Sequence, residues 1–156
     1  YGGDQRVIQE QDVIILDLGC RYKSYCSDTS RTFFVGEPTD EQRKIYEIVR
    51  LAQAAGEAAV KPGATGQDVD RAARRIIEEA GYGKYFFNRV GIAVHENPYI
   101  IEGNDKPLKP GNVFSIEPGI YIAGKFGMRI ENLVAVKPDG TAEALNKTTR
   151  EMRIIR

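Results

Sequence analysis

The stretch from Asp17 to Asp28 reads DLGCRYKSYCSD, so it begins and ends with an aspartate. It lies between two apolar runs, VIIL before it and TFFV after it. Short runs rich in β-branched and aromatic residues are typical of strands, which predicts strands over residues 12–17 and 30–35. The polar pair Lys23-Ser24 predicts a turn between them, and the whole segment is therefore predicted to be a β-hairpin.

The composition is that of an ordinary globular domain. The chain has 156 residues, of which 42% are apolar and 28% charged, and it carries 22 basic and 22 acidic side chains. This size allows one domain with a hydrophobic core. The zero net charge argues against a nucleic-acid partner and against a polybasic membrane-surface protein. Because no apolar run approaches ~18 residues and no signal peptide opens the chain, we expect no membrane association and a cytoplasmic location.

Two amphipathic helices are predicted after the hairpin. The first begins at a capping box that opens with Thr39 and ends before residues 61–63, which read KPG. The second begins at Thr65 or Gly66 and is closed by Gly81.

The remaining chain returns to strand patterns. Residues 112–122 and 126–136 are two strand-like runs joined by a short loop, and residues 151–156 are a candidate last strand. This order predicts an α+β fold in which two helices pack on a largely antiparallel sheet. No helix precedes the first hairpin, so we expect a domain that is entered partway.

Counting residues outward from each turn predicts which side chains face each other. A turn at Tyr22-Lys23 in the first hairpin would place Asp17 opposite Asp28. The same count from the loop of the second hairpin places Glu117 opposite Glu131. Like charges directly opposed on a sheet destabilise it, and two carboxylates that share a site cannot both stay ionised without compensation.

Two kinds of positive charge can supply this compensation. Arg129 precedes Glu131 by two residues and is predicted to lie on the same face. A bound cation would compensate more fully, and a site rich in carboxylates suits Mn²⁺, Co²⁺ or Mg²⁺ more than a thiol-preferring metal. Two metals bridged by carboxylates would polarise a carbonyl and generate a hydroxide nucleophile. The alternative is that all four acids lie on exposed strand faces, where Asp and Glu are common.

Five ordered motifs resemble those of the pita-bread metallopeptidases, in particular the Xaa-Pro aminopeptidase and Xaa-Pro dipeptidase (prolidase) branch. They are DLGCRYKSYCSDTSRTFFVG, KPGATGQDVDRAARRIIEEAG, the segment HENP, PLKPGNVFSIEPGIYI and FGMRIENLVAV. The resemblance covers nearly the whole chain and implies the pita-bread (creatinase/aminopeptidase-like) fold. Residues 1–156 would then be a single, partial, C-terminal catalytic domain that is incomplete at its N-terminus.

The resemblance also implies a role for each candidate site residue. His95 would donate a hydrogen bond to the scissile carbonyl or the tetrahedral intermediate. Glu117 would carry a proton from the metal-bound water to the leaving amine, and Arg129 would steady the carboxylates. Two divalent cations are implied, with Mn or Co favoured and Zn or Mg as alternatives. The implied metal ligands are Asp17, Asp28, Glu117 and Glu131.

The implied activity is that of a metal-dependent exopeptidase. It would hydrolyse the bond between an N-terminal residue and a following proline through a dinuclear metal-bound hydroxide. The implied partner is a peptide with proline in its second position, and homodimers are frequent in the family. Methionine aminopeptidase shares the eleven-residue spacing of Asp17 and Asp28, but the RTFFVG, H-E-x-P and GKFGMRIEN stretches favour the proline-specific branch.

One departure from the family pattern keeps a second function open. The family places a further metal-ligating histidine in a Gly-His-Gly loop, whereas His95 is the single histidine of this chain. The preferred alignment leaves about four residues, including that ligand, without a counterpart between Gly91 and Ile92. The alternative function is therefore a non-peptidase with the same fold, either a metal-free creatinase-like amidinohydrolase or a binding scaffold.

Overall fold

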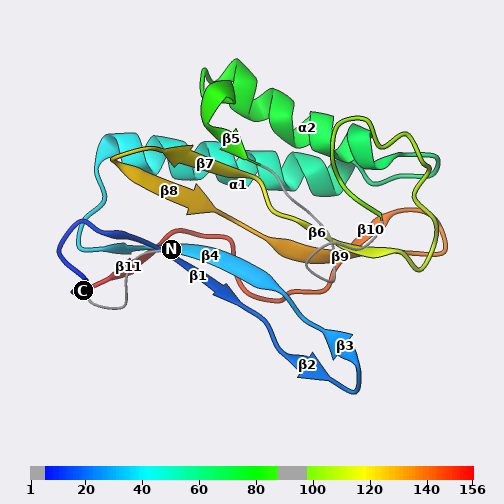
Figure 1. Cartoon of the computed structure of the whole chain (residues 1–156), viewed down its shortest axis with the longest axis horizontal. Coiled ribbons are helices and arrows are strands. Elements are labelled where there is room, and N and C mark those ends of the chain that lie inside the picture. The colour runs from blue at the N-terminus through cyan, green and yellow to red at the C-terminus, as the bar shows by residue number, and fades with distance from the viewer. Residues whose placement is uncertain (1–5, 88–97) are drawn as a thin grey trace.

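The computed structural model describes residues 6–87 and 98–156. Two helices, α1 (Asp40–Ala59) and α2 (Gly66–Glu79), lie together on one side of a set of small, mostly antiparallel sheets (Figure 1). The predicted α+β architecture is confirmed. Among the described residues, no helix combines the length and the apolar character that crossing a bilayer requires.

Both helices begin at the predicted caps. Thr39 and Gln42 form a complete capping box at the start of α1, and Thr65 and Asp68 form a second one at the start of α2. In each box the threonine hydroxyl accepts from a backbone N–H of the first turn, and the side chain three residues on accepts from the cap's own N–H. Gly81 ends α2 with a φ of 86°, the left-handed conformation that favours glycine after a helix.

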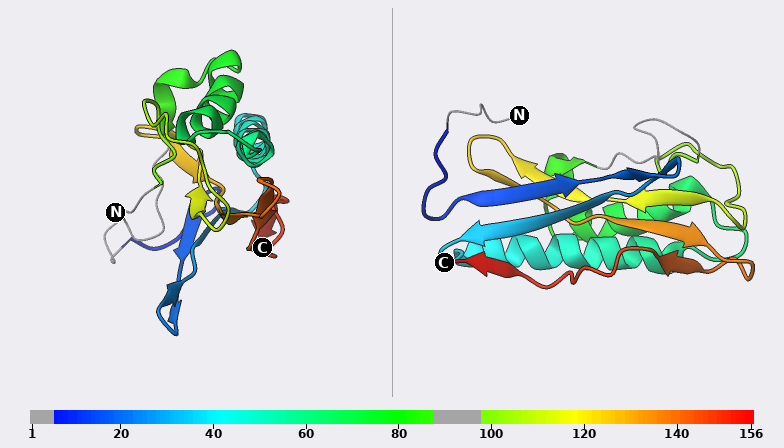
Figure 2. Two further views of the ribbon diagram at one scale, coloured as in Figure 1. Left: turned by 90° about the vertical axis from the view of Figure 1, so that its right-hand side faces the viewer. Right: turned by 90° about the horizontal axis from the view of Figure 1, so that it is seen from below.

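The first hairpin builds a three-stranded sheet. β1 (Val13–Leu18) pairs antiparallel with β4 (Thr29–Val35), and β11 (Arg153–Ile155) adds to the other edge of β4 in the parallel direction. The last strand is thus confirmed. β2 (Arg21–Tyr22) and β3 (Tyr25–Cys26) extend the hairpin as a two-stranded arm that projects away from the helices (Figure 2).

The register of this hairpin differs from the predicted one. Asp17 faces Ser30 rather than Asp28, because the turn lies at Lys23-Ser24, the pair predicted from its polarity, and not at Tyr22-Lys23, from which the facing residues were counted. Lys23 and Ser24 both have positive φ, as a two-residue hairpin turn requires, and this moves the register by two residues. Side chains alternate faces with a period of two, so Asp28 still belongs to the same face as Asp17, in a diagonal position.

The second hairpin is longer and interrupted. The two predicted strands are each divided, into β6 (Val113–Ile116) and β7 (Gly119–Ile122), and into β8 (Phe126–Arg129) and β9 (Asn132–Val136). The interruption in the first strand falls at Glu117-Pro118, and proline has no N–H to donate to a ladder. Two short strands add to the edges: β5 (Phe86–Phe87), which follows the 3₁₀-helix Gly83–Tyr85, pairs with β7, and β10 (Ala142–Ala144) pairs with β9.

The register is the same on both sides of the interruption. Ile122 faces Phe126, as predicted, and Ile116 faces Asn132 on the far side. The same register places Glu117 opposite Glu131, at the interruption of the two strands. The interruption removes both residues from the regular ladder and frees their side chains to enter a site.

The apolar core lies between the helices and the strands. As expected of an amphipathic helix, α1 buries one face, at Ile45, Val49 and Ala52, and this face meets Phe34 of β4. Gly56 allows α1 to pack close against β6, because a Cβ at this position would lie 2.8 Å from Cγ2 of Ile116. This packing fixes β4 against the strands of the second hairpin, which is what brings the acidic residues of the two hairpins together.

Candidate metal centre

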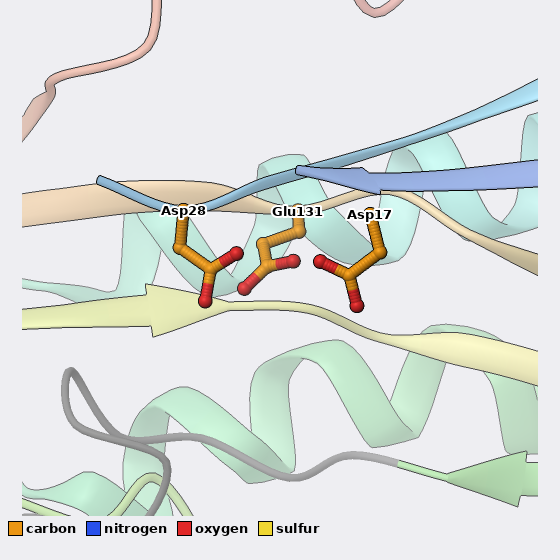
Figure 3. A group of neighbouring side chains, drawn as sticks. All are labelled: Asp17, Asp28 and Glu131. Carbon is orange, nitrogen blue, oxygen red and sulfur yellow. The ribbon is translucent and has the colours of Figure 1, made fainter. Parts of the chain in front are cut away.

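Three of the four predicted metal ligands form one cluster. Asp17 lies near the end of β1, Asp28 directly precedes β4, and Glu131 lies between β8 and β9. One carboxylate oxygen from each lies within 4.8 Å of the other two. Figure 3 shows the three side chains pointing to a common region, with Glu131 between the aspartates.

The environment disfavours negative charge on the inner members of this cluster. Glu131 is only 2% exposed, and its carboxylate accepts a hydrogen bond of 2.6 Å from the Ser30 hydroxyl. Burial raises the pKa of Glu131 to about 6, even though the Ser30 hydrogen bond lowers it, and the charge of Asp28 adds to the rise. Burial likewise raises the pKa of Asp28, with the charge of Asp17 as the second cause.

Glu117, the fourth predicted ligand, lies outside the group of three. Its carboxylate accepts a hydrogen bond of 3.1 Å from Ser115, and its Oε2 lies 3.7 Å from Nε of Arg129. Burial raises its pKa to about 8, and the charge of Glu131 is the second cause. The pKa of Glu117 thus responds to the cluster although its oxygens do not join it.

Arg129 lies between two of the predicted acids. Its guanidinium forms an ion pair with Asp17 and approaches Glu117, and its Nε donates to the Ser30 hydroxyl at 3.0 Å. Its Nη1 donates to the Tyr121 hydroxyl at 2.9 Å. One cation therefore neutralises part of the negative charge of the site from one side.

Sequence reasoning missed Ser30 and Tyr121. The signal for Ser30 was its place two residues after Asp28, which puts it on the same face of the hairpin. The signal for Tyr121 was the pair of glycines around it. A Cβ at Gly119 would lie 2.6 Å from the Tyr121 ring, and one at Gly127 would lie 2.5 Å from it, so both glycines leave room for the ring.

The carboxylates of this site fit a divalent cation. Glu131 is nearly fully buried, has a raised pKa and lies next to two aspartates, so the positive charge around it does not balance the negative charge of the three carboxylates. Hard oxygen donors such as these are the ligands that Mn²⁺ and Mg²⁺ prefer. The predicted donor His95 and the segment around Gly91 and Ile92 lie outside the described residues.

Known proteins resemble the chain along nearly its full length. It is 44% identical to an Xaa-Pro dipeptidase of Lactobacillus delbrueckii subsp. lactis over 99% of its residues. The crystal structure of a recombinant prolidase from Thermococcus sibiricus matches 99% of the chain with a TM-score of 0.93 and 46% identity. That of an X-Pro aminopeptidase from Thermotoga maritima matches 97% with a TM-score of 0.91 and 40% identity.

The matches cover nearly all of this chain but less than half of each relative. The chain spans 43% of the Lactobacillus dipeptidase, 43% of the Thermococcus prolidase and 44% of the Thermotoga aminopeptidase. The alignment with the Lactobacillus protein runs over 158 positions, whereas this chain has 156 residues, so at least some residues of that relative have no counterpart here. The model of metallopeptidase family M24 matches residues 1–138. The chain therefore belongs to metallopeptidase family M24, and its fold is the pita-bread fold of the prolidases and X-Pro aminopeptidases.

Proposed function

We propose that the full-length protein is a metal-dependent exopeptidase that hydrolyses the bond between an N-terminal residue and a following proline. The observation that carries this proposal is the convergence of Asp17, Asp28 and Glu131 on one region of the site. Membership of family M24 and similarity to Xaa-Pro dipeptidases support it. Because the chain spans less than half of these relatives, we propose the activity for the whole protein, of which residues 1–156 form a partial catalytic domain.

The proposed cofactor is a pair of divalent cations, Mn²⁺ or Co²⁺. Asp17, Asp28 and Glu131 would hold them, and Glu117, whose pKa responds to the charges of Glu131 and Asp28, is proposed as the fourth carboxylate. When bound, the cations would polarise the scissile carbonyl and activate the attacking water.

The chain's own residues would orient the groups and move the proton. Arg129 holds Asp17 in place and keeps its guanidinium beside Glu117, which limits the repulsion between the acids. Glu117 is also proposed to carry a proton to the leaving amine, since its pKa of about 8 allows it to accept and release a proton near neutral pH. His95 is proposed as the hydrogen-bond donor to the carbonyl oxygen of the substrate.

The test is cleavage of an Xaa-Pro dipeptide and of a longer peptide with proline second, with Mn²⁺ or Co²⁺ added and then removed by a chelator. Metal-dependent release of the N-terminal residue is expected, and Asp28→Asn should abolish it. Asp105→Asn, at an exposed position, is the matched control and should retain activity. If the full-length protein cleaves neither peptide at any metal concentration, the proposal is wrong.

The same experiment tests the alternative function. A metal-free amidinohydrolase or a binding scaffold is favoured by one observation, that the sequence holds a single histidine and lacks the second imidazole of the family pattern. Such a protein would bind no metal at the carboxylates and would cleave neither peptide. Metal analysis of the purified protein therefore separates the two functions before any activity is measured.

A further inference from the structure

Arg31 is a buried cation that directly follows Ser30 in β4. The residue is 8% exposed, and burial lowers the pKa of its guanidinium. Within the described segments Arg31 forms no ion pair, and its guanidinium donates to carbonyl, hydroxyl and amide oxygens. A buried charge is costly unless many hydrogen bonds satisfy it, so this arrangement needs a reason.

The hydrogen bonds of Arg31 join segments that are far apart in the sequence. Its Nη1 donates to the backbone carbonyl of Glu131 and, at 2.8 Å, to that of Ser30. Its Nη2 donates to Oδ1 of Asn132 at 2.7 Å and to the carbonyl and hydroxyl of Thr148 at 2.8 and 2.7 Å.

The segment around Thr148 is held at further points. Nε of Arg31 donates to the Thr149 carbonyl at 2.9 Å. The Arg150 guanidinium pairs with Glu57 of α1 at 2.8 Å, and Glu57 in turn accepts from Asn132 at 2.8 Å. This segment lies beyond residues 1–138, the part of the chain that the family model matches.

β4 holds Glu131 by both its main chain and its side chain. Neighbouring residues of a strand point to opposite faces. Ser30 therefore reaches the carboxylate of Glu131 on the site face, at 2.6 Å, while Arg31 reaches its carbonyl from the other side. The N–H of Glu131 donates to the Ser30 carbonyl at 3.1 Å, so the residue is fixed at three points in a segment with no regular strand pairing.

We propose that Arg31 is a positioning residue for the Glu131 carboxylate, and that the Thr148-Thr149 segment latches its guanidinium in place. This inference rests on the proposed function, because it assigns Arg31 a role in metal affinity. Loss of partners behind the direct ligands of a metal commonly weakens its binding by roughly 10–100-fold. An arginine is needed because its planar fork donates in several directions at once, which a lysine ammonium on a flexible stem does not reproduce.

The test uses the full-length protein with its metal first removed. Co²⁺ is titrated into the parent and into Arg31→Lys, and both the dissociation constant and the visible absorption of bound Co²⁺ are recorded. We expect Arg31→Lys to weaken binding by roughly 10–100-fold and to alter the absorption spectrum, because Glu131 is no longer held in one position. In activity assays kcat should fall more than KM rises.

Tyr46→Phe is the matched control. It removes a hydrogen bond of 3.2 Å from the Tyr46 hydroxyl to the Arg150 carbonyl, and so loosens the same C-terminal segment while leaving every hydrogen bond of Arg31 and Glu131 named above in place. Its Co²⁺ affinity and spectrum should match the parent. Equal losses in Tyr46→Phe and Arg31→Lys would show that general loosening is responsible, and would overturn the inference.

Two further outcomes distinguish a failure of the proposed function from a failure of the role proposed for Arg31. A parent protein that binds no Co²⁺ would contradict the proposed function itself, whereas a parent that binds Co²⁺ no better than Arg31→Lys would contradict only the role of Arg31. If Arg31→Lys does not fold, the variant Thr148→Val tests the role of Arg31 in its place. This variant removes the hydroxyl that accepts a hydrogen bond from the Arg31 guanidinium, and it should weaken Co²⁺ binding several-fold. Unchanged binding would contradict the proposed role of the Thr148-Thr149 segment.

Discussion

Glu117 makes the stability of the metal-free protein depend on pH in a direction opposite to that of most carboxylates. Its side chain is 19% exposed, and burial together with the charge of Glu131 raises its pKa from 4.5 to about 8. The folded state therefore binds the proton more tightly than the unfolded state does. The stabilising contribution is complete below pH 4.5 and is lost as the pH rises through about 8.

The size of this effect follows from the change in pKa. Raising a pKa from 4.5 to about 8 corresponds to roughly 5 kcal/mol of unfolding free energy across the whole range. Because Glu131, with a pKa of about 6, contributes in the lower part of this range, the interval from pH 6 to 8 isolates Glu117. There we expect the parent to lose roughly 2–3 kcal/mol, whereas Glu117→Gln should lose little, because the amide does not ionise.

The assay is equilibrium unfolding in urea, followed by circular dichroism, with a chelator present at pH 5, 6, 7, 8 and 9. Glu117→Gln should match the parent at pH 5 and exceed it by several kcal/mol at pH 9. Glu143→Gln, which changes an exposed strand residue, should follow the parent at every pH. Equal loss of stability in the parent and Glu117→Gln between pH 6 and 8 would refute the reasoning.

Three other changes test the site and its support. Mn²⁺ at about 100 times its dissociation constant should raise the unfolding free energy of the parent by about 3 kcal/mol, measured in urea with and without chelator, and that of Glu131→Gln by much less. Gly19→Ala would place a Cβ 2.5 Å from the carbonyl oxygen of Ser27, so the hairpin must shift and Mn²⁺ affinity should fall in calorimetric titration; an unchanged affinity would contradict this. Gly56→Ala would place a Cβ 2.8 Å from Ile116 and should cost about 1–3 kcal/mol by overpacking, seen as a lower urea midpoint at constant m-value.

Short-range patterns account for what the sequence predicted correctly. The capping threonines, the helix stop at Gly81 and the buried face of α1 follow from local hydrogen bonding and from the 3.6-residue period, which depend on nearby residues alone. The acids of the first hairpin share a face because of the strand period of two. This parity survives a register error of two residues, so Asp17 and Asp28 meet although they are not directly opposed.

Tertiary structure decided the finer organisation of the site. The two positive-φ residues of the first turn set the register that places Ser30, and not Asp28, opposite Asp17. The interruptions of the second hairpin place Glu131 in the cluster with Asp17 and Asp28, whereas Glu117 lies beside Arg129.

The sequence by itself determined the two helices, the first hairpin, the fold class and the family, and it predicted four acids of which three cluster. The hydrogen bonds from Arg31 to Glu131 and to Thr149 span 100 and 118 residues, and no local pattern encodes such contacts. They exist because the core packs β4 against the second hairpin and because a buried guanidinium must find oxygen acceptors wherever the fold supplies them. The local sequence pattern predicts which acids are candidate metal ligands, whereas the packing of the core determines which residues hold them.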